Sequence, residues 1–206
     1  MRPDRIPLFP LNVVLLPGEQ RPLHIFEPRY RHMVRECLDE KKHFGMLLAV
    51  NDGVVRVGCT TEILEVIKTY EDGRMDIITV GRDPFRVVEL YSDEPLLHGR
   101  VDYLDDRDSL PEPAARNTLI ELYETCHTLI FSTLPKSLDS GSAEKLSYAI
   151  ASTLPIELMW KQQILELRTE ADRQVHLLAY LRDWAPHLQK SQTIRKRAAG
   201  NGQGLN

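Results

Sequence analysis

Two long strand-like runs joined by a short turn constrain the fold of this chain more than any other feature. The runs are VRVGCTTEILEVIKTY and RMDIITVGRDPFRVVELYS, and the dipeptide Asp72-Gly73 lies between them. Asp-Gly is a strong signal for a two-residue hairpin turn, in which both central residues need positive φ. The pattern therefore predicts a long antiparallel hairpin in which Tyr70 faces Met75 across the strands.

Shorter apolar runs on either side of this hairpin predict further strands. IPLF, NVVLLPG and RPLHIF precede the hairpin, FGMLLAV lies directly before it, and a last strand is expected near residues 97–104. The prolines in the first runs suit sheet edges and strand starts rather than a central strand. One helix is expected within this β region, from Pro28 to about Lys41, because apolar residues recur there at helical spacing.

The composition changes after the last predicted strand. The segment DDRDSLPEPAA is polar and carries two prolines, which is typical of a boundary between lobes. Beyond it the apolar residues follow helical spacing, and Thr169 with Asp172 resembles a capping box. We predict an antiparallel β lobe with an inserted helix over residues 1–110, a helical lobe over 111–190 and a flexible tail over 191–206.

The bulk composition excludes several classes of protein. The chain has 206 residues, 42% of them hydrophobic, and its net charge is −4 with a pI near 6.0, so no global basic field attracts nucleic acid. The apolar N-terminal stretch is too short and too often broken by proline to span a membrane, and it lacks a signal-peptide cleavage pattern. We therefore expect a cytoplasmic protein that binds neither nucleic acid nor membranes.

Motifs that would carry chemistry are missing from the sequence. The three cysteines lie far apart without C-x-x-C spacing, and no two of the seven histidines form H-E-x-x-H, so we expect buried free thiols, no metal and no cofactor. There is no G-x-S-x-G nucleophile elbow and no phosphate-binding loop. A catalytic Cys/His pair stays open, since such partners can be distant in sequence.

The stretch Phe26-Glu27-Pro28-Arg29-Tyr30 joins a predicted strand to the predicted helix. Pro28 suits the first helical turn, where its missing N–H costs nothing. Glu27 can act near the N-cap, and Phe26 can pack on the first turn as a hydrophobic staple. We interpret the stretch as a structural motif that fixes the angle of the helix; the alternative is that Glu27 and Arg29 contact a ligand.

The order of these segments resembles the N-terminal, substrate-binding domain of the ATP-dependent protease Lon, and standalone bacterial members of that family most of all. The opening IPLFPLNVVLLPGEQRPLHIFEPRYRHMV carries the resemblance, followed by FGML, VGCTTEILEV, DGRMDIITVGRDPFRV and LSYAIASTLPIELMWKQQILEL. The resemblance implies an α+β fold, namely a PUA-like antiparallel β barrel with one inserted helix, followed by an α-helical bundle. It also implies recognition of unfolded or tagged proteins, and the related domain of cereblon implies an adaptor role.

We therefore predict a non-catalytic module that binds unfolded or exposed polypeptide segments, without the ATPase and Ser-Lys protease domains of Lon. Tyr70 and Met75, beside the hairpin turn, are the predicted polypeptide-binding residues, because an aromatic next to a methionine at an exposed tip forms adaptable apolar surface. A homo-oligomer is possible. One alternative is a small-molecule-binding protein or an unrecognised hydrolase that uses a cleft between the lobes. Another is a structural adaptor that brings a partner to a protease.

Overall fold

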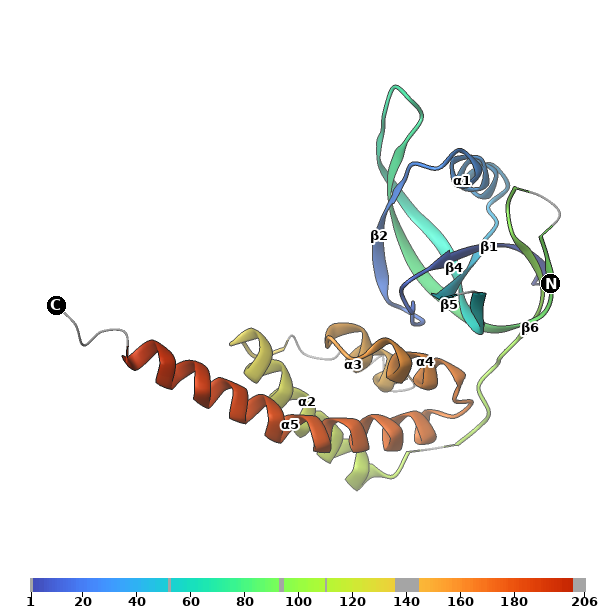
Figure 1. Ribbon diagram of the computed structural model, residues 1–206. Helices are drawn as coiled ribbons and strands as arrows, with labels where there is room; N and C mark the ends of the chain where they lie inside the picture. Colours follow the sequence, from blue (N-terminus) through green and yellow to red (C-terminus); the bar gives the residue numbers. More distant parts are fainter. Residues whose placement is uncertain (1, 52, 93–94, 110, 136–144, 202–206) are drawn as a thin grey trace. The chain divides into compact units, whose positions relative to one another are not determined.

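The computed structural model describes residues 2–51, 53–92, 95–109, 111–135 and 145–201. The chain forms two compact units (Figure 1): Met1–Asp106 with Pro155–Arg168, and Arg107–Leu154 with Thr169–Asn206. Helix α4 (Leu158–Glu166) belongs to the first unit, where Nε2 of Gln162 donates a 3.0 Å hydrogen bond to the carbonyl of Val57. We predicted this helix as part of the helical lobe over residues 111–190. Apolar periodicity shows that a segment is helical, but it does not show which part of the chain the helix packs against.

The first unit is built on a six-stranded sheet that nearly closes into a ring. The strand order is β2-β5-β4-β3-β1-β6, and β5 also pairs with β6. The sheet is mixed rather than purely antiparallel as predicted, because β1 and β3 run parallel. The chain between them contains β2 and helix α1 (Pro28–Glu40), which is enough to return it to the same end of the sheet. The strands are β1 (Arg5–Leu11), β2 (Gln20–Ile25), β3 (Phe44–Val50), β4 (Gly53–Thr69), β5 (Met75–Tyr91) and β6 (His98–Tyr103).

The run NVVLLPG is not a strand, and this prediction is wrong. Val14, Leu15 and Leu16 are buried in an irregular connection, which meets the sheet at an isolated bridge between Pro17 and Gly81. A Cβ at Gly81 would collide with the carbonyl of Leu16. The apolar character of the run therefore reflects burial under the barrel rather than strand pairing.

The core of the barrel is centred on Phe85, whose side chain is fully buried. Two glycines make room for its ring: an added Cβ would lie 2.6 Å from Cζ of Phe85 at Gly45 and 2.9 Å from it at Gly58. The Phe85 ring therefore packs directly against the backbone of the two strands at Gly45 and Gly58, which leaves little free space in the core. The other buried members are Ile6, Leu8, Leu47, Val87 and Val101.

Helix α1 (Pro28–Glu40) matches the prediction in position. Tyr30, Met33, Val34 and Cys37 are buried. The helix ends where Lys41 adopts a left-handed conformation, with φ of 53°. The N–H of Lys41 donates a hydrogen bond to the carbonyl of Cys37 in the last turn. This termination turns the chain back toward β3.

The turn between β4 and β5 differs from the prediction by one residue. The N–H of Gly73 donates to the carbonyl of Tyr70, the N–H of Tyr70 donates to the carbonyl of Arg74, and only Gly73 has positive φ. This is a three-residue loop rather than a two-residue turn. The register therefore shifts, so that Thr69, not Tyr70, lies opposite Met75.

The second unit contains α2 (Pro113–Phe131), α3 (Leu146–Thr153) and α5 (Glu170–Asn201), and α2 and α5 pack together. The buried residues of α2 are Leu119, Tyr123 and Cys126. Leu134 lies beyond the end of α2 and is exposed. Helix α5 overlaps the segment 191–206 that we predicted as a tail. Within the described residues no helix is both long and apolar enough to cross a membrane.

The three cysteines are buried, as predicted, and give a first testable expectation. Desolvation raises the pKa of Cys37 to about 12 and that of Cys126 to about 11. At pH 8 both thiols are therefore protonated, and the thiolate is the reactive form. We expect the native protein to react far more slowly with 5,5′-dithiobis(2-nitrobenzoic acid) than the urea-unfolded chain, which releases three equivalents. An engineered Glu71→Cys in the exposed turn is the control and reacts at once; equally fast native cysteines would contradict the burial.

Candidate functional site

The junction between β2 and α1 is organised around Tyr30. Its ring packs on Phe9 with centroids 4.2 Å apart, and the carbonyl of Glu27 accepts the N–H groups of Tyr30 and Arg31. Pro28 occupies the start of the helix. These contacts fix the direction in which α1 leaves the sheet.

Glu27 lies at the N-cap, as predicted, whereas the prediction for Phe26 is wrong. Glu27 is the N-cap residue, but its carboxylate makes no capping bond and instead accepts a 2.9 Å hydrogen bond from Nε of Arg29. Phe26 does not pack on the first helical turn, since 59% of its surface is exposed. Its ring stacks on His24 of β2, with centroids 6.1 Å apart. Phe26 is therefore a surface aromatic rather than a staple.

Phe26 is linked through His24 to Tyr70 at the turn of the β4–β5 hairpin, because the His24 and Tyr70 ring centroids lie 5.8 Å apart. This hairpin extends beyond the rest of its unit (Figure 1) and carries further exposed apolar side chains. Leu64 is 44% exposed and Ile67 58% exposed on β4, and Tyr70 is half-buried at the turn. We call these residues, with His24, the hairpin surface: His24, Phe26, Leu64, Ile67 and Tyr70. Large apolar side chains exposed on a projecting hairpin and beside it are typical of an interaction site.

A small polar network orients the aromatic rings of the hairpin surface. Nδ1 of His24 lies 2.6 Å from Oδ1 of Asp76, and the hydroxyl of Tyr70 donates a 2.7 Å hydrogen bond to Oδ2 of the same carboxylate. The hydrogen bond with His24 is the main cause that lowers the pKa of Asp76, and the bond to Asp76 raises the pKa of Tyr70. Nζ of Lys68 lies 4.4 Å from the centroid of the Tyr70 ring. The orientation of Tyr70 is thus fixed by a hydrogen bond at its hydroxyl and by a cation over its ring.

Met75 occupies a different place from the one its sequence position suggested. It is 3% exposed and lies opposite Ile25 on one side and Thr69 on the other. The prediction that Met75 is an exposed tip residue is wrong, because the three-residue turn rotates it to the inner face of the strands. His24 and Asp76 were not singled out from sequence; only their register across β2 and β5 brings them together.

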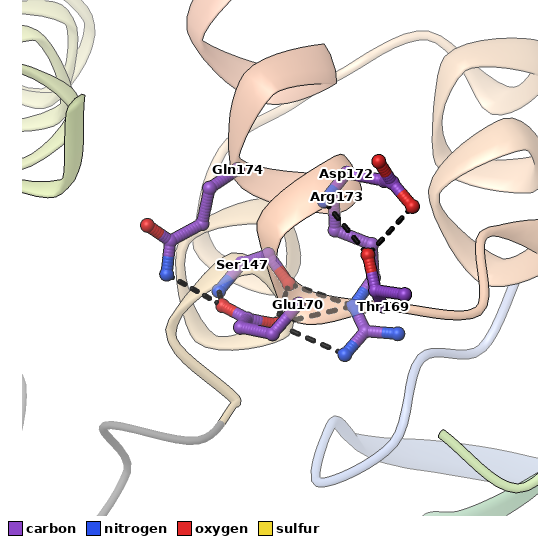
Figure 2. Close-up of polar contacts among 6 residues, drawn as sticks. All are labelled: Ser147, Thr169, Glu170, Asp172, Arg173 and Gln174. Atoms are coloured by element: carbon purple, nitrogen blue, oxygen red, sulfur yellow. Dashed lines mark hydrogen bonds and ion pairs between the residues drawn. The ribbon is translucent and has the colours of Figure 1, made fainter. Parts of the chain in front are cut away.

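The second unit holds a buried polar cluster of a different kind, shown in Figure 2. Arg173 of α5 is 0% exposed, and Nη2 donates a 3.0 Å hydrogen bond to Oε2 of Glu170. The Glu170 carboxylate also accepts the hydroxyl of Ser147 at 2.6 Å and the backbone N–H of Ser147 at 2.9 Å. Gln174 donates to Glu170 from the next turn. The carboxylate therefore caps the start of α3 and ties it to α5.

This cluster is built for structure rather than catalysis. The Ser147 hydroxyl is fully buried and donates to a carboxylate that an arginine already neutralises, so that carboxylate is a poor general base. Thr169 caps α5 as predicted, because its hydroxyl accepts the N–H of Asp172 at 3.0 Å. Among the residues that the structure describes, no group of histidine, cysteine, aspartate or glutamate side chains is arranged to hold a metal ion.

Comparison with known proteins points to one family. The model of the ATP-dependent protease La (LON) substrate-binding domain matches residues 5–183. The crystal structure of a Lon N-terminal domain protein from Xanthomonas campestris superposes with a TM-score of 0.68 and 26% sequence identity, over 85% of this chain and 98% of that chain.

Two curated relatives show how far the similarity extends. The Lon protease of Cytophaga hutchinsonii is 23% identical over 193 residues, which are 85% of this chain and 24% of that protein. Protein cereblon of Xenopus tropicalis is 32% identical over 137 residues, which are 63% of this chain and 30% of cereblon. Among four similar Lon proteases the matched share is 14 to 26%, so this chain spans about a quarter of their length or less.

Proposed function

Because this chain belongs to the family of Lon substrate-binding domains, we propose that it is a non-catalytic module that binds exposed, unfolded polypeptide segments. The family match covers a substrate-binding domain and no catalytic domain. The buried polar cluster around Glu170 contains Ser147, but this serine is not accessible as a nucleophile, which supports a binding role. Binding of protein substrates by the family is thus the premise, and the choice of unfolded segments is the proposal.

The observation that carries this proposal is the hairpin surface. Phe26, at the junction between β2 and α1, is 59% exposed, and Ile67, on β4 of the hairpin, is 58% exposed. A polypeptide that covers them removes apolar area from water, at roughly 25 cal/mol per Å². Tyr70, fixed by Asp76, supplies a rigid ring that loses little entropy on binding. Such a surface selects apolar segments broadly and binds them weakly, which suits many different clients.

Replacing both Phe26 and Ile67 by serine is expected to weaken binding of an unfolded polypeptide by about 30-fold. Each side chain contributes about 1 kcal/mol when a partner covers it, and about 2 kcal/mol corresponds to that factor. The probe is reduced, carboxymethylated α-lactalbumin, which cannot refold, and its affinity is measured by isothermal titration calorimetry.

The matched control is Val88→Ser, which removes an exposed apolar side chain from β5 on the same barrel. This control is expected to bind the probe like the unaltered protein. Equal losses in the control and in the double variant would mean that any apolar surface serves, and the hairpin surface would lose its role. Absence of binding by the unaltered protein would remove the proposed function itself.

A further inference from the structure

Strand β4 has a free edge over its second half. It pairs with β3 only as far as Thr61, which lies opposite Phe44, whereas β5 follows it to Thr69. Among the described residues no backbone group pairs with the other side of β4 between Glu62 and Thr69. An open row of backbone donors and acceptors is a template for one more strand.

The hydrogen bonds of the turn show which groups face this free edge. The N–H of Tyr70 donates to the carbonyl of Arg74, so it points into the hairpin. Successive residues of a strand point their backbone groups to opposite edges. The N–H of Thr69 is therefore directed to the free edge and is available to a partner.

Apolar side chains border the same edge. Leu64 and Ile67 are exposed along it. At its inner end a cavity of about 190 Å³ opens between the end of α1 and β4. Leu38 and Ile63 line it together with Cys37 and the polar residues Lys41, Lys42, His43 and Glu62. The free edge of β4 thus offers both backbone hydrogen-bonding groups and neighbouring apolar side chains, and strand addition uses both.

We infer that an extended polypeptide segment adds to β4 as an extra strand along residues 62–69, with alternate apolar side chains against Leu38, Ile63, Leu64 and Ile67. This inference rests on the proposed function and names how the client is held. Main-chain hydrogen bonds do not depend on client sequence, so they provide affinity for many unfolded chains. The apolar border then favours segments with branched or aromatic residues at every second position.

The edge suits a single extended segment better than a second copy of the same edge. The β4–β5 register shifts between Ile63 and Glu65 and again between Val66 and Lys68, which twists the strand locally. A second copy would have to match the same two irregularities with its own, whereas an unfolded segment can adjust its backbone to them. Charged residues stand beside these irregularities, a common protection against edge-to-edge association. The other exposed edge of the hairpin sheet, β2, contains Pro22, which lacks an N–H.

Thr69→Pro tests the inference, with Thr69→Ala as the matched control. The proline removes one donor from the free edge and leaves the inward hydrogen bonds of the hairpin in place. We expect Thr69→Pro to bind reduced, carboxymethylated α-lactalbumin about fivefold to tenfold more weakly, as loss of a backbone hydrogen bond predicts. Thr69→Ala keeps the N–H and binds normally. Circular dichroism confirms that both variants are folded.

Amide hydrogen exchange by NMR locates the bound client independently of the proline variant. In the unaltered protein, saturation with the probe is expected to slow exchange at outward-facing amides of residues 62–69 and to leave β2 amides unchanged. Binding without added protection on β4 would overturn strand addition while the proposed function stands. Absence of binding would overturn both, and a change in oligomeric state on Thr69→Pro would assign the edge to a second copy instead.

Discussion

Replacement of Arg173 by alanine is expected to destabilise the helical unit by about 3–5 kcal/mol, a large share of the stability of a typical domain. The substitution leaves the Glu170 carboxylate buried without its cation, which is the main cost. It also removes the guanidinium that lies 4.4 Å from the centroid of the Tyr148 ring. The cap on α3 weakens as well, because Glu170 holds the N–H of Ser147.

Urea unfolding followed by Trp184 fluorescence measures this loss, in a Trp160→Phe background that leaves Trp184 of α5 as the single tryptophan. Arg182→Ala, an exposed arginine on the same helix, is the control and is expected to change stability by less than about 0.5 kcal/mol. The double variant Glu170→Gln, Arg173→Met is expected to recover part of the loss, since it removes both charges. A loss no larger than that of Arg182→Ala would show that the buried pair is unimportant.

Phe85→Ala is expected to destabilise the barrel by about 3–5 kcal/mol. The ring fills the space that Gly45 and Gly58 leave between the strands, so its removal opens a cavity that neither strand can close. The neighbouring side chains of Ile6 and Leu8 are themselves fully packed in the same cluster. Their rotamers offer little freedom to fill the void.

The matched variant Phe85→Leu retains most of the apolar volume and is expected to lose clearly less stability than the alanine variant. Trp160 of α4, in the first unit, reports unfolding in a Trp184→Phe background. If the alanine and leucine variants lose the same free energy of unfolding, the surrounding side chains fill the cavity. The close packing around the two glycines would then contribute little to stability. The stability of each variant follows from the urea midpoint and slope.

Much of the fold was predictable because local patterns are strong in this chain. The helical spacing from Pro28 and the β-branched runs of β4 and β5 gave the right elements, and Thr169 marked the start of α5 correctly. The parallel pairing of β1 with β3 was not predictable, because both strands are short apolar runs that carry no sign of their partner. The buried loop before β2 was mistaken for a strand for the same reason.

The candidate site was predictable only in part. Tyr70 could be placed near the hairpin turn, but the one-residue difference in turn length exchanged an exposed Met75 for a buried one. Phe26 was expected to be packed, and its exposure depends on how β2 meets α1. The link between His24 and Asp76 spans 52 positions and arises only from the β2–β5 register.

The amino-acid sequence by itself determined most of the elements and the family, since both depend on the order of residue types along the chain. Tertiary structure alone decided the ring closure through β5 and β6, the placement of α4 against the barrel, and the open edge of β4. These features arise from pairings between distant segments. Which distant segments pair depends on small differences in free energy that arise from hydrogen bonds and packing. Local sequence patterns do not reveal these differences.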